Sequence, residues 1–141
     1  MRPGVRLLVW GRADLGQLGL GQASEGFPVG DAGAAVPLPT PLEALSGKDV
    51  VGFAAGPFHS AFVTADGELY TTGCNDNGQL GRRITPANIA AAAAAAGASS
   101  TSSSSPPACS YSLAPGHVTA LESYGVAAVG CGGAHTLALT D

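Results

Sequence analysis

Short apolar runs separated by turn residues set the pattern of this chain. The runs Val50–Ala55 and Ser60–Thr64 are apolar or β-branched, and Gly56-Pro57-Phe58 lies between them. Gly-Pro interrupts a helix and turns the chain, so the two runs are predicted to be strands. A third run, Glu68–Gly73, follows Asp66-Gly67. Because a type I′ turn needs positive φ at both central residues and favours Asp-Gly, we predict a tight hairpin there.

The chain also repeats itself. The nine residues Gly11–Gly19 recur 62 positions later as Gly73–Gly81, and both copies read G-x-x-D-x-G-Q-L-G. A second block, Pro39–Thr64, recurs 76 positions later as Pro115–Thr140. The difference between the offsets of 76 and 62 predicts a 14-residue insertion between Gly81 and Pro115. A strand-rich unit of about 60 residues is typical of propeller blades.

The repeat divides the chain into three parts. Residues 1–81 form a first repeat region, in which Val5–Trp10 matches the return strand Glu68–Gly73 and is therefore the last strand of one unit. Residues 82–110 are a low-complexity Ala/Ser insertion, and residues 111–141 are an incomplete second repeat. Thr140-Asp141 corresponds to Thr64-Ala65, so we expect the second unit to lack its return strand.

The insertion carries its own helix signals. Thr85 suits an N-cap, Pro86 suits the first helical position, and seven Ala precede Gly97. Such a helix is only about three turns long, which is marginal in water without a packed face. Ser99–Pro107 is typical of a flexible linker. We expect a surface insertion that is partly helical at most.

Composition narrows the class of protein. Charged residues are 11% of the chain, well below the usual share of about 25%, and 21 residues are Gly. This balance favours short strands and tight turns over exposed, charged helices. The net charge is −4 with six Lys and Arg, so we expect no direct nucleic-acid binding through phosphate neutralisation. No apolar stretch reaches the roughly 18 residues of a membrane span, and no signal peptide is predicted. Three cysteines without a C-x-x-C pair fit a reducing compartment, so we expect an intracellular protein, cytoplasmic or nuclear.

The order of these motifs resembles the repeat of the regulator of chromosome condensation family. G-x-x-x-x-G-Q-L-G precedes Pro-x-x-Leu and then Ala-Ala-Gly-x-x-His-Ser-x-x-Val-Thr-x-Asp-Gly-x-Leu-Tyr-x-x-Gly, and the resemblance covers nearly all of the chain outside residues 82–110. It implies an all-β fold of four-stranded blades from a seven-bladed β-propeller. About two blades and part of a third fit in this chain, whereas a propeller closes with about four to eight. We therefore expect a fragment, or a chain completed by other copies, that self-associates through unpaired strand edges when expressed alone.

Candidate chemistry begins with two histidines. His59 precedes Ser60, and His135 precedes Thr136. Neighbouring residues on a strand point to opposite faces, so neither ring can activate the adjacent hydroxyl. Because the motif recurs with the repeat, we predict that each His bonds the backbone of a neighbouring turn.

The spacing of cysteines, histidines and glycines also bears on whether the chain has a metal or phosphate site. Cys74, Cys131 and His135 lack the paired spacing of a zinc site, and buried inert thiols fit better. The glycine stretches 18–21 and 130–133 lack the Lys-Ser/Thr of a Walker loop and the helix of a dinucleotide fingerprint, so turns and bulges are expected there. We expect no catalytic residue, no cofactor and no metal.

The repeated polar residues Asp14, Gln17, Asp76 and Gln79 are predicted to close the loops between blades by hydrogen bonds to the loop backbone. They are therefore interpreted as scaffold positions.

The leading hypothesis is a non-enzymatic propeller module for protein–protein interaction or scaffolding, with a partner surface built from loops such as Gly21–Val36. The family resemblance implies an alternative, guanine-nucleotide exchange on a small Ras-like GTPase. A third hypothesis from the same resemblance is light sensing, as in a similar plant ultraviolet-B photoreceptor, whose chemistry needs a cluster of Trp side chains. This chain has only Trp10.

Overall fold

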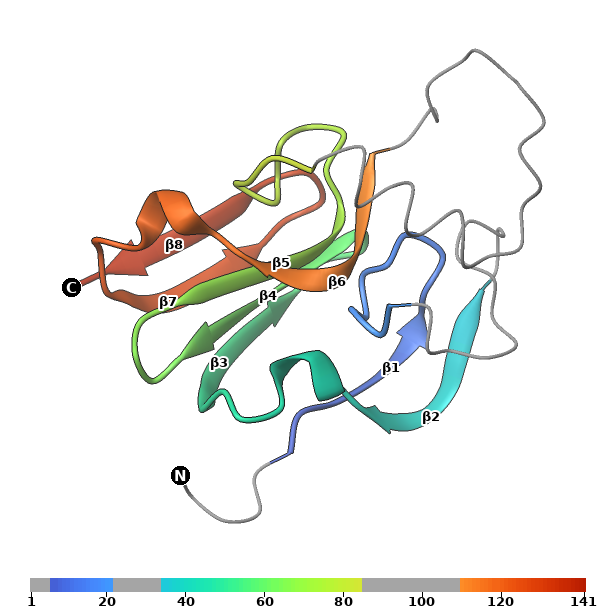
Figure 1. Cartoon of the computed structure of the whole chain (residues 1–141). Helices are drawn as coiled ribbons and strands as arrows, with labels where there is room; N and C mark the ends of the chain where they lie inside the picture. The colour runs from blue at the N-terminus through green and yellow to red at the C-terminus, as the bar shows by residue number, and fades with distance from the viewer. Residues whose placement is uncertain (1–5, 22–33, 85–109) are drawn as a thin grey trace.

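The computed structural model describes residues 6–21, 34–84 and 110–141, and these residues are nearly all β (Figure 1). The described strands and 3-10 helices are β1 (Leu8–Arg12), β2 (Ala35–Pro41), η1 (Glu43–Leu45), β3 (Val50–Ala55), β4 (His59–Thr64), β5 (Leu69–Cys74), β6 (Tyr111–His117), η2 (Thr119–Leu121), β7 (Val126–Cys131) and β8 (Thr136–Thr140). The predicted all-β class is confirmed.

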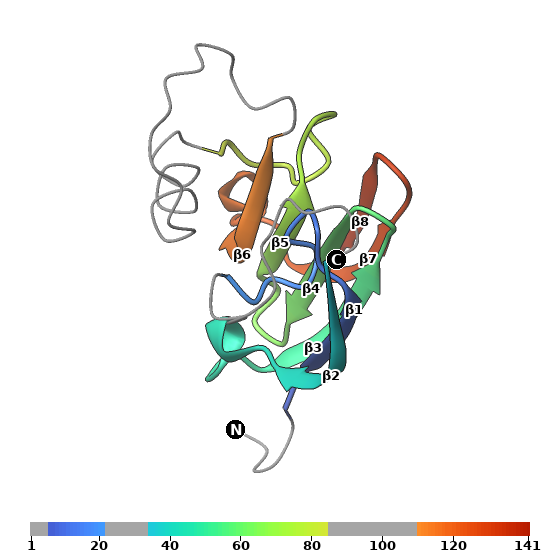
Figure 2. The ribbon, with the colours of Figure 1, turned by 90° about the vertical axis from the view of Figure 1, so that its right-hand side faces the viewer.

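The described strands form three antiparallel sheets. The central one has four strands in the order β3-β4-β5-β6, and β1-β2 and β7-β8 form two hairpin-like pairs. Figures 1 and 2 show these two pairs on opposite sides of the central sheet. One complete blade therefore stands between two half-blades, which refines the expectation of about two blades and part of a third.

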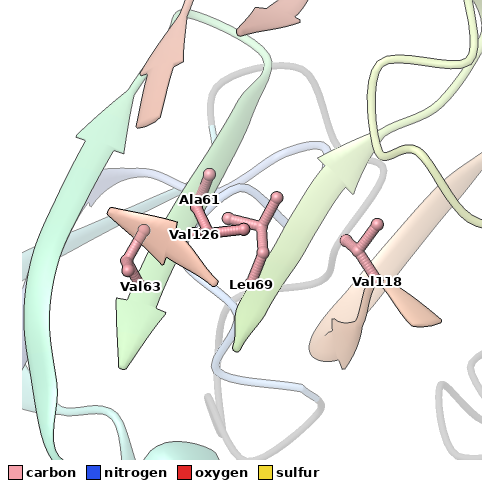
Figure 3. Packing of buried hydrophobic residues seen from close by; sticks show 5 residues of the cluster. All are labelled: Ala61, Val63, Leu69, Val118 and Val126. Carbon is pink, nitrogen blue, oxygen red and sulfur yellow. The ribbon is translucent and has the colours of Figure 1, made fainter. Parts of the chain in front are cut away.

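Strand β4 contributes to the packing on both faces of the central sheet, because alternate residues of a strand point to opposite faces. On one face, Ala61 and Val63 pack with Leu69 of β5 and with Val118 and Val126 of the following repeat (Figure 3). On the other face, Phe62 packs with Leu42 and Leu45, and the partly buried side chains around them are Leu7, Val9, Leu20, Val50 and Tyr70. All six residues of β4 are buried.

The backbone repeats with the sequence. Leu7 O accepts from Leu42 N at 2.9 Å, and Leu69 O accepts from Val118 N at 2.8 Å. The β3–β4 and β7–β8 pairs each carry a register shift near their start, after Val50 and after Val126. The two repeats therefore share local geometry as well as sequence.

The hairpin between β4 and β5 differs from the type I′ prediction. Gly67 has φ +81°, but Asp66 does not have a positive φ. Thr64 O accepts from Gly67 N at 2.9 Å, and Glu68 O accepts from Thr64 N at 3.0 Å. Ala65 thus joins the loop as a third residue, and only the glycine needs the left-handed region.

Two strands carry prolines and were not predicted. β2 contains Pro37, Pro39 and Pro41, and β6 contains Pro115. β6 is the last strand of the central sheet, and β2 pairs only with β1 among the strands described. Proline is tolerated at a sheet edge because its missing N–H can face away from the neighbouring strand. The predicted helix from Thr85 and the predicted linker after it lie outside the described residues.

Candidate functional site

The Gly-Gln-Leu-Gly loops follow β1 and β5 and are braced by their glutamines. Gln17 Oε1 accepts from Leu15 N at 2.8 Å, and Gln79 Oε1 accepts from Asn77 N at 2.9 Å. Both glutamines are buried. The predicted hydrogen bonds from these side chains to the loop backbone are confirmed.

The two aspartates of the loops differ. Asp76 Oδ1 accepts from Ser110 N at 2.6 Å, which is the predicted type of backbone bond. Asp14 instead bonds side chains: Arg12 Nε and Nη2 donate to its two oxygens at 2.7 and 2.6 Å, and Gln17 Nε2 donates at 3.0 Å. The Arg12 guanidinium holds the pKa of Asp14 below its ordinary value. A backbone hydrogen bond at Asp14 itself also lowers this pKa, so the predicted backbone bond is accompanied at Asp14 by side-chain bonds that were not predicted.

Hydroxyl groups then tie each loop to the next repeat. Ser60 Oγ donates to Gln17 O at 2.7 Å, and Thr136 Oγ1 donates to Gln79 O at 2.6 Å. These are equivalent bonds, since Ser60 and Thr136 occupy the same place in the two repeats. The loop of one repeat is thus fixed to the strand of the following repeat.

His59 is fully buried and spans the same boundary. Its Nε2 lies 2.7 Å from Thr136 Oγ1, and the Thr136 hydrogen is already directed to Gln79 O. Nε2 therefore carries the ring proton and donates, which leaves Nδ1 as a buried acceptor without a hydrogen-bond partner. Burial lowers the pKa of His59, so the ring is neutral.

The predicted partner of His59 was a turn backbone. The ring bonds the Thr136 hydroxyl of the next repeat, and a hydrogen bond with the backbone of His135, in the turn between β7 and β8, also acts on its pKa. The expected separation of His59 from Ser60 does hold, because Ser60 bonds Gln17 instead. His135, the equivalent of His59, is exposed, and its ring lies against Gly132, where an added Cβ would collide with it.

The cysteines are less uniform than expected. Cys74 is buried, but Cys131 is half-buried and donates to Ala54 O at 3.5 Å. Burial raises the pKa of the Cys131 thiol. Within the described ranges, no three His, Cys, Asp or Glu side chains gather closely enough to hold a metal ion. Cys109 lies outside the described residues.

Sequence reasoning missed three residues that fasten the strands. Thr72 Oγ1 donates to Gly16 O at 2.8 Å, and Thr71 Oγ1 donates to Leu80 O at 2.8 Å. Arg82, assigned to the start of the insertion, places Nη2 2.8 Å from both Thr71 O and Ser112 Oγ. No spacing in the sequence indicates these contacts, because Thr is an ordinary strand residue.

The family assignment rests on two family models. The model described as the regulator of chromosome condensation repeat matches residues 6–63 and 66–139, and a second model of the same description matches residues 50–79. The chain belongs to the regulator of chromosome condensation repeat family. The blade architecture found above is the fold that this resemblance implies.

Curated relatives in this family are much longer than the chain. The human E3 ubiquitin-protein ligase HERC2 is 33% identical over 129 residues, which are 92% of this chain and 2% of HERC2. The ultraviolet-B receptor UVR8 of Arabidopsis thaliana is 30% identical over 138 residues, and the regulator of chromosome condensation of Xenopus laevis is 31% identical over 138 residues. Each of these two matches covers 98% of this chain and 24% of the relative.

Solved structures agree on the fold. Prp20p of Saccharomyces cerevisiae matches with a TM-score of 0.69 at 23% identity, over 95% of this chain and 26% of Prp20p. Human WBSCR16 matches with a TM-score of 0.65 at 23% identity, over 96% of this chain and 31% of WBSCR16. In the described part of the chain, no helix is long and apolar enough to cross a membrane.

Proposed function

We propose that this chain is part of a non-enzymatic propeller module that binds a protein partner through its loops. The observation that supports the proposal is the use of the repeated polar groups. Ser60, Gln79 and Thr136 are engaged in hydrogen bonds between repeats, and His59 is buried among them. Because these polar residues hold the repeats together, we expect partner recognition to depend on the loops, where binding residues usually lie in such folds.

The partner class has support from one structural neighbour. Prp20p of Saccharomyces cerevisiae has binding properties to Gsp1p and histones. We propose a protein partner for this chain on that likeness, without nucleic-acid or membrane binding and without a cofactor.

A loop replacement tests the interaction module. Residues 22–33 would be replaced by a Gly-Ser segment of equal length, with Ser60→Ala as a scaffold variant that leaves the loop sequence intact. Proteins captured by the wild-type chain would be purified and titrated by calorimetry. Loss of binding in the loop variant, with an unchanged unfolding midpoint and retained binding in Ser60→Ala, supports the proposal. Binding that survives the loop replacement contradicts it.

Guanine-nucleotide exchange on a small Ras-like GTPase is the alternative that the family resemblance favours. The assay is release of fluorescent GDP from the loaded GTPase in the presence of the chain. Our proposal predicts no acceleration at micromolar chain. An acceleration that scales with chain concentration would establish exchange activity in its place.

Light sensing is the least supported alternative. The likeness to UVR8 raises it, but Trp10 is the single Trp of the chain. We therefore predict that ultraviolet-B illumination leaves the size-exclusion profile unchanged. A profile that shifts on illumination and recovers in the dark would favour a photoreceptor.

A further inference from the structure

A four-residue turn joins η1 to β3, and all four of its residues, Ser46–Asp49, are exposed. It lies where the β1-β2 pair meets the complete blade. Lys48 Nζ donates to Glu68 Oε2 at 2.8 Å, and Asp49 O accepts from Ala65 N at 2.8 Å. The turn is thus exposed although the hairpin between β4 and β5 packs beside it, and both repeats that meet at this boundary contribute to its surroundings.

The Ser46 hydroxyl is free to react. Within residues 6–21, 34–84 and 110–141, the Ser46 side chain has no hydrogen-bond partner. Ser46 is the first residue after η1, and its φ of −59° and ψ of 130° are extended. Gly47 follows with φ +84°, which a residue with a side chain rarely adopts. The hydroxyl therefore stands on extended backbone at the surface, outside the helical turn that precedes it.

A carboxylate follows this hydroxyl at a fixed distance along the chain. Asp49 stands three residues after Ser46. The ion pairs among the described residues are Arg12–Asp14 and Lys48–Glu68, so the Asp49 carboxylate is not held by a cation. Lys48, which lies between the two groups, is already neutralised by Glu68. An enzyme with a basic subsite can hold such a carboxylate through charge-assisted hydrogen bonds while the hydroxyl enters its active site.

Two other hydroxyl residues of the sequence, Thr40 and Thr119, have a carboxylate three positions later. Thr40 lies within β2, and its hydroxyl donates to Leu38 O at 2.9 Å. Thr119 begins η2, and the backbone is still helical at Glu122, with φ −58° and ψ −32°. Ser46 alone among the three has both an unbonded hydroxyl and an extended backbone.

The fold accommodates a negative charge at this place. The offset of 76 carries Ser46 to Glu122, which is exposed in the turn after η2. The same offset carries Lys48 to Tyr124, so the second turn has its acidic residue without a lysine beside it. A negative charge at position 46 would in addition have Lys48 two residues away.

We propose that Ser46 is a phosphorylation site for an acidophilic protein kinase, one that requires a carboxylate three residues after the hydroxyl. The Ser46 oxygen forms a bond to the γ-phosphorus of ATP, the bond from that phosphorus to the β,γ-bridging oxygen breaks, and ADP leaves. The hydroxyl proton passes to the catalytic base of the kinase. The product carries about −1.5 to −2 charges near pH 7 and competes with Glu68 for Lys48. This proposal concerns the turn and does not depend on the partner of the loops.

Phosphate mapping tests the site. The full chain is incubated with ATP and casein kinase II, an acidophilic kinase with this requirement, and the phosphopeptides are quantified by mass spectrometry. Ser46 should carry several-fold more phosphate than Thr40 or Thr119, which serve as controls of equal spacing in the same molecule. Phosphate that is absent from Ser46, or present at Ser46 in no greater amount than at the two threonines, overturns the proposal.

Two aspartate variants test how the site is recognised. Asp49→Asn should lower the rate of Ser46 phosphorylation by about tenfold or more, because the charge-assisted bonds of the carboxylate are lost. Asp66→Asn is the matched control, since Asp66 is exposed on the neighbouring hairpin, and it should leave the rate unchanged. The rates are compared at a temperature at which thermal scans show both variants to be folded. Equal rates in the two variants overturn the proposal.

Discussion

At the scale of single residues, the boundary between repeats depends on a buried neutral histidine. His59 donates to Thr136 while its Nδ1 has no donor in its buried surroundings. Burial lowers the pKa of the His59 ring and the nearby His135 lowers it further, and together they outweigh a hydrogen bond with the His135 backbone that raises it. The ring is therefore suited to a structural role and unsuited to proton transfer with a substrate.

The first prediction concerns pH. Because the pKa of His59 is lowered in the folded state, the unfolded chain binds the proton more readily. The free energy of unfolding should be constant above about pH 7.5 and fall as the pH drops below about 6.5. Urea unfolding followed by circular dichroism from pH 8 to pH 5, at one protein concentration, measures it. His59→Gln should remove the slope, and His117→Gln should retain it; identical slopes in all three proteins would contradict the account.

The second prediction concerns the hydroxyl at the boundary. Thr136→Val removes the donor to Gln79 O and the acceptor of His59 Nε2. Leaving these groups unpaired should lower the free energy of unfolding by about 1–3 kcal/mol. Thr119→Val, at an exposed position of η2, is the control and should change it by less than about 0.5 kcal/mol. Equal losses in the two variants would show that the Thr136 contacts are not formed.

At the scale of elements, the sequence predicts the strands that contain ordinary apolar runs and misses those that contain proline. β3, β4 and β5 agree with the predicted runs within one residue, and β1 begins at Leu8 instead of Val5. β2 and β6 escape prediction because proline is normally evidence against a strand, and only the pairing shows that both lie at an edge.

Polar contacts within a repeated motif are predictable from the sequence, and polar contacts between distant residues are not. The Gln17 and Gln79 bonds are local to motifs that repeat, so they could be inferred. The bond from Ser60 to Gln17 and that from Thr72 to Gly16 join residues 43 and 56 positions apart. Contacts of this range depend on how blades stack, which residue spacing alone does not specify.

The third prediction compares two equivalent glycines. Gly73 has φ +113° and Gly11 has φ +108°, so Ala is strained at both. An added Cβ at Gly73 would lie 2.5 Å from Phe58 O, whereas nothing lies within 4 Å at Gly11. Gly73→Ala should therefore cost more than about 2 kcal/mol and Gly11→Ala about 1 kcal/mol, as measured by urea unfolding. Similar losses would mean that β5 does not approach the start of β4 as described.

At the scale of the whole molecule, the described residues form one complete blade between two half-blades. The exposed side chains Leu137 and Leu139 of β8 are equivalent to Ala61 and Val63 of β4, which are buried inside the chain. Unpaired edges of apolar strands tend to pair with other strands. We therefore propose that the chain self-associates when it is expressed alone.

Sedimentation velocity of the full chain across roughly 1–100 µM, around the micromolar affinity expected of a modest interface, tests this account most directly. We predict that the sedimentation coefficient rises with concentration, and that Leu137→Glu, which places a charge on the exposed face of β8, shifts the rise to higher concentration. A compact monomer over the whole range, unfolding cooperatively at a midpoint independent of concentration, would contradict it.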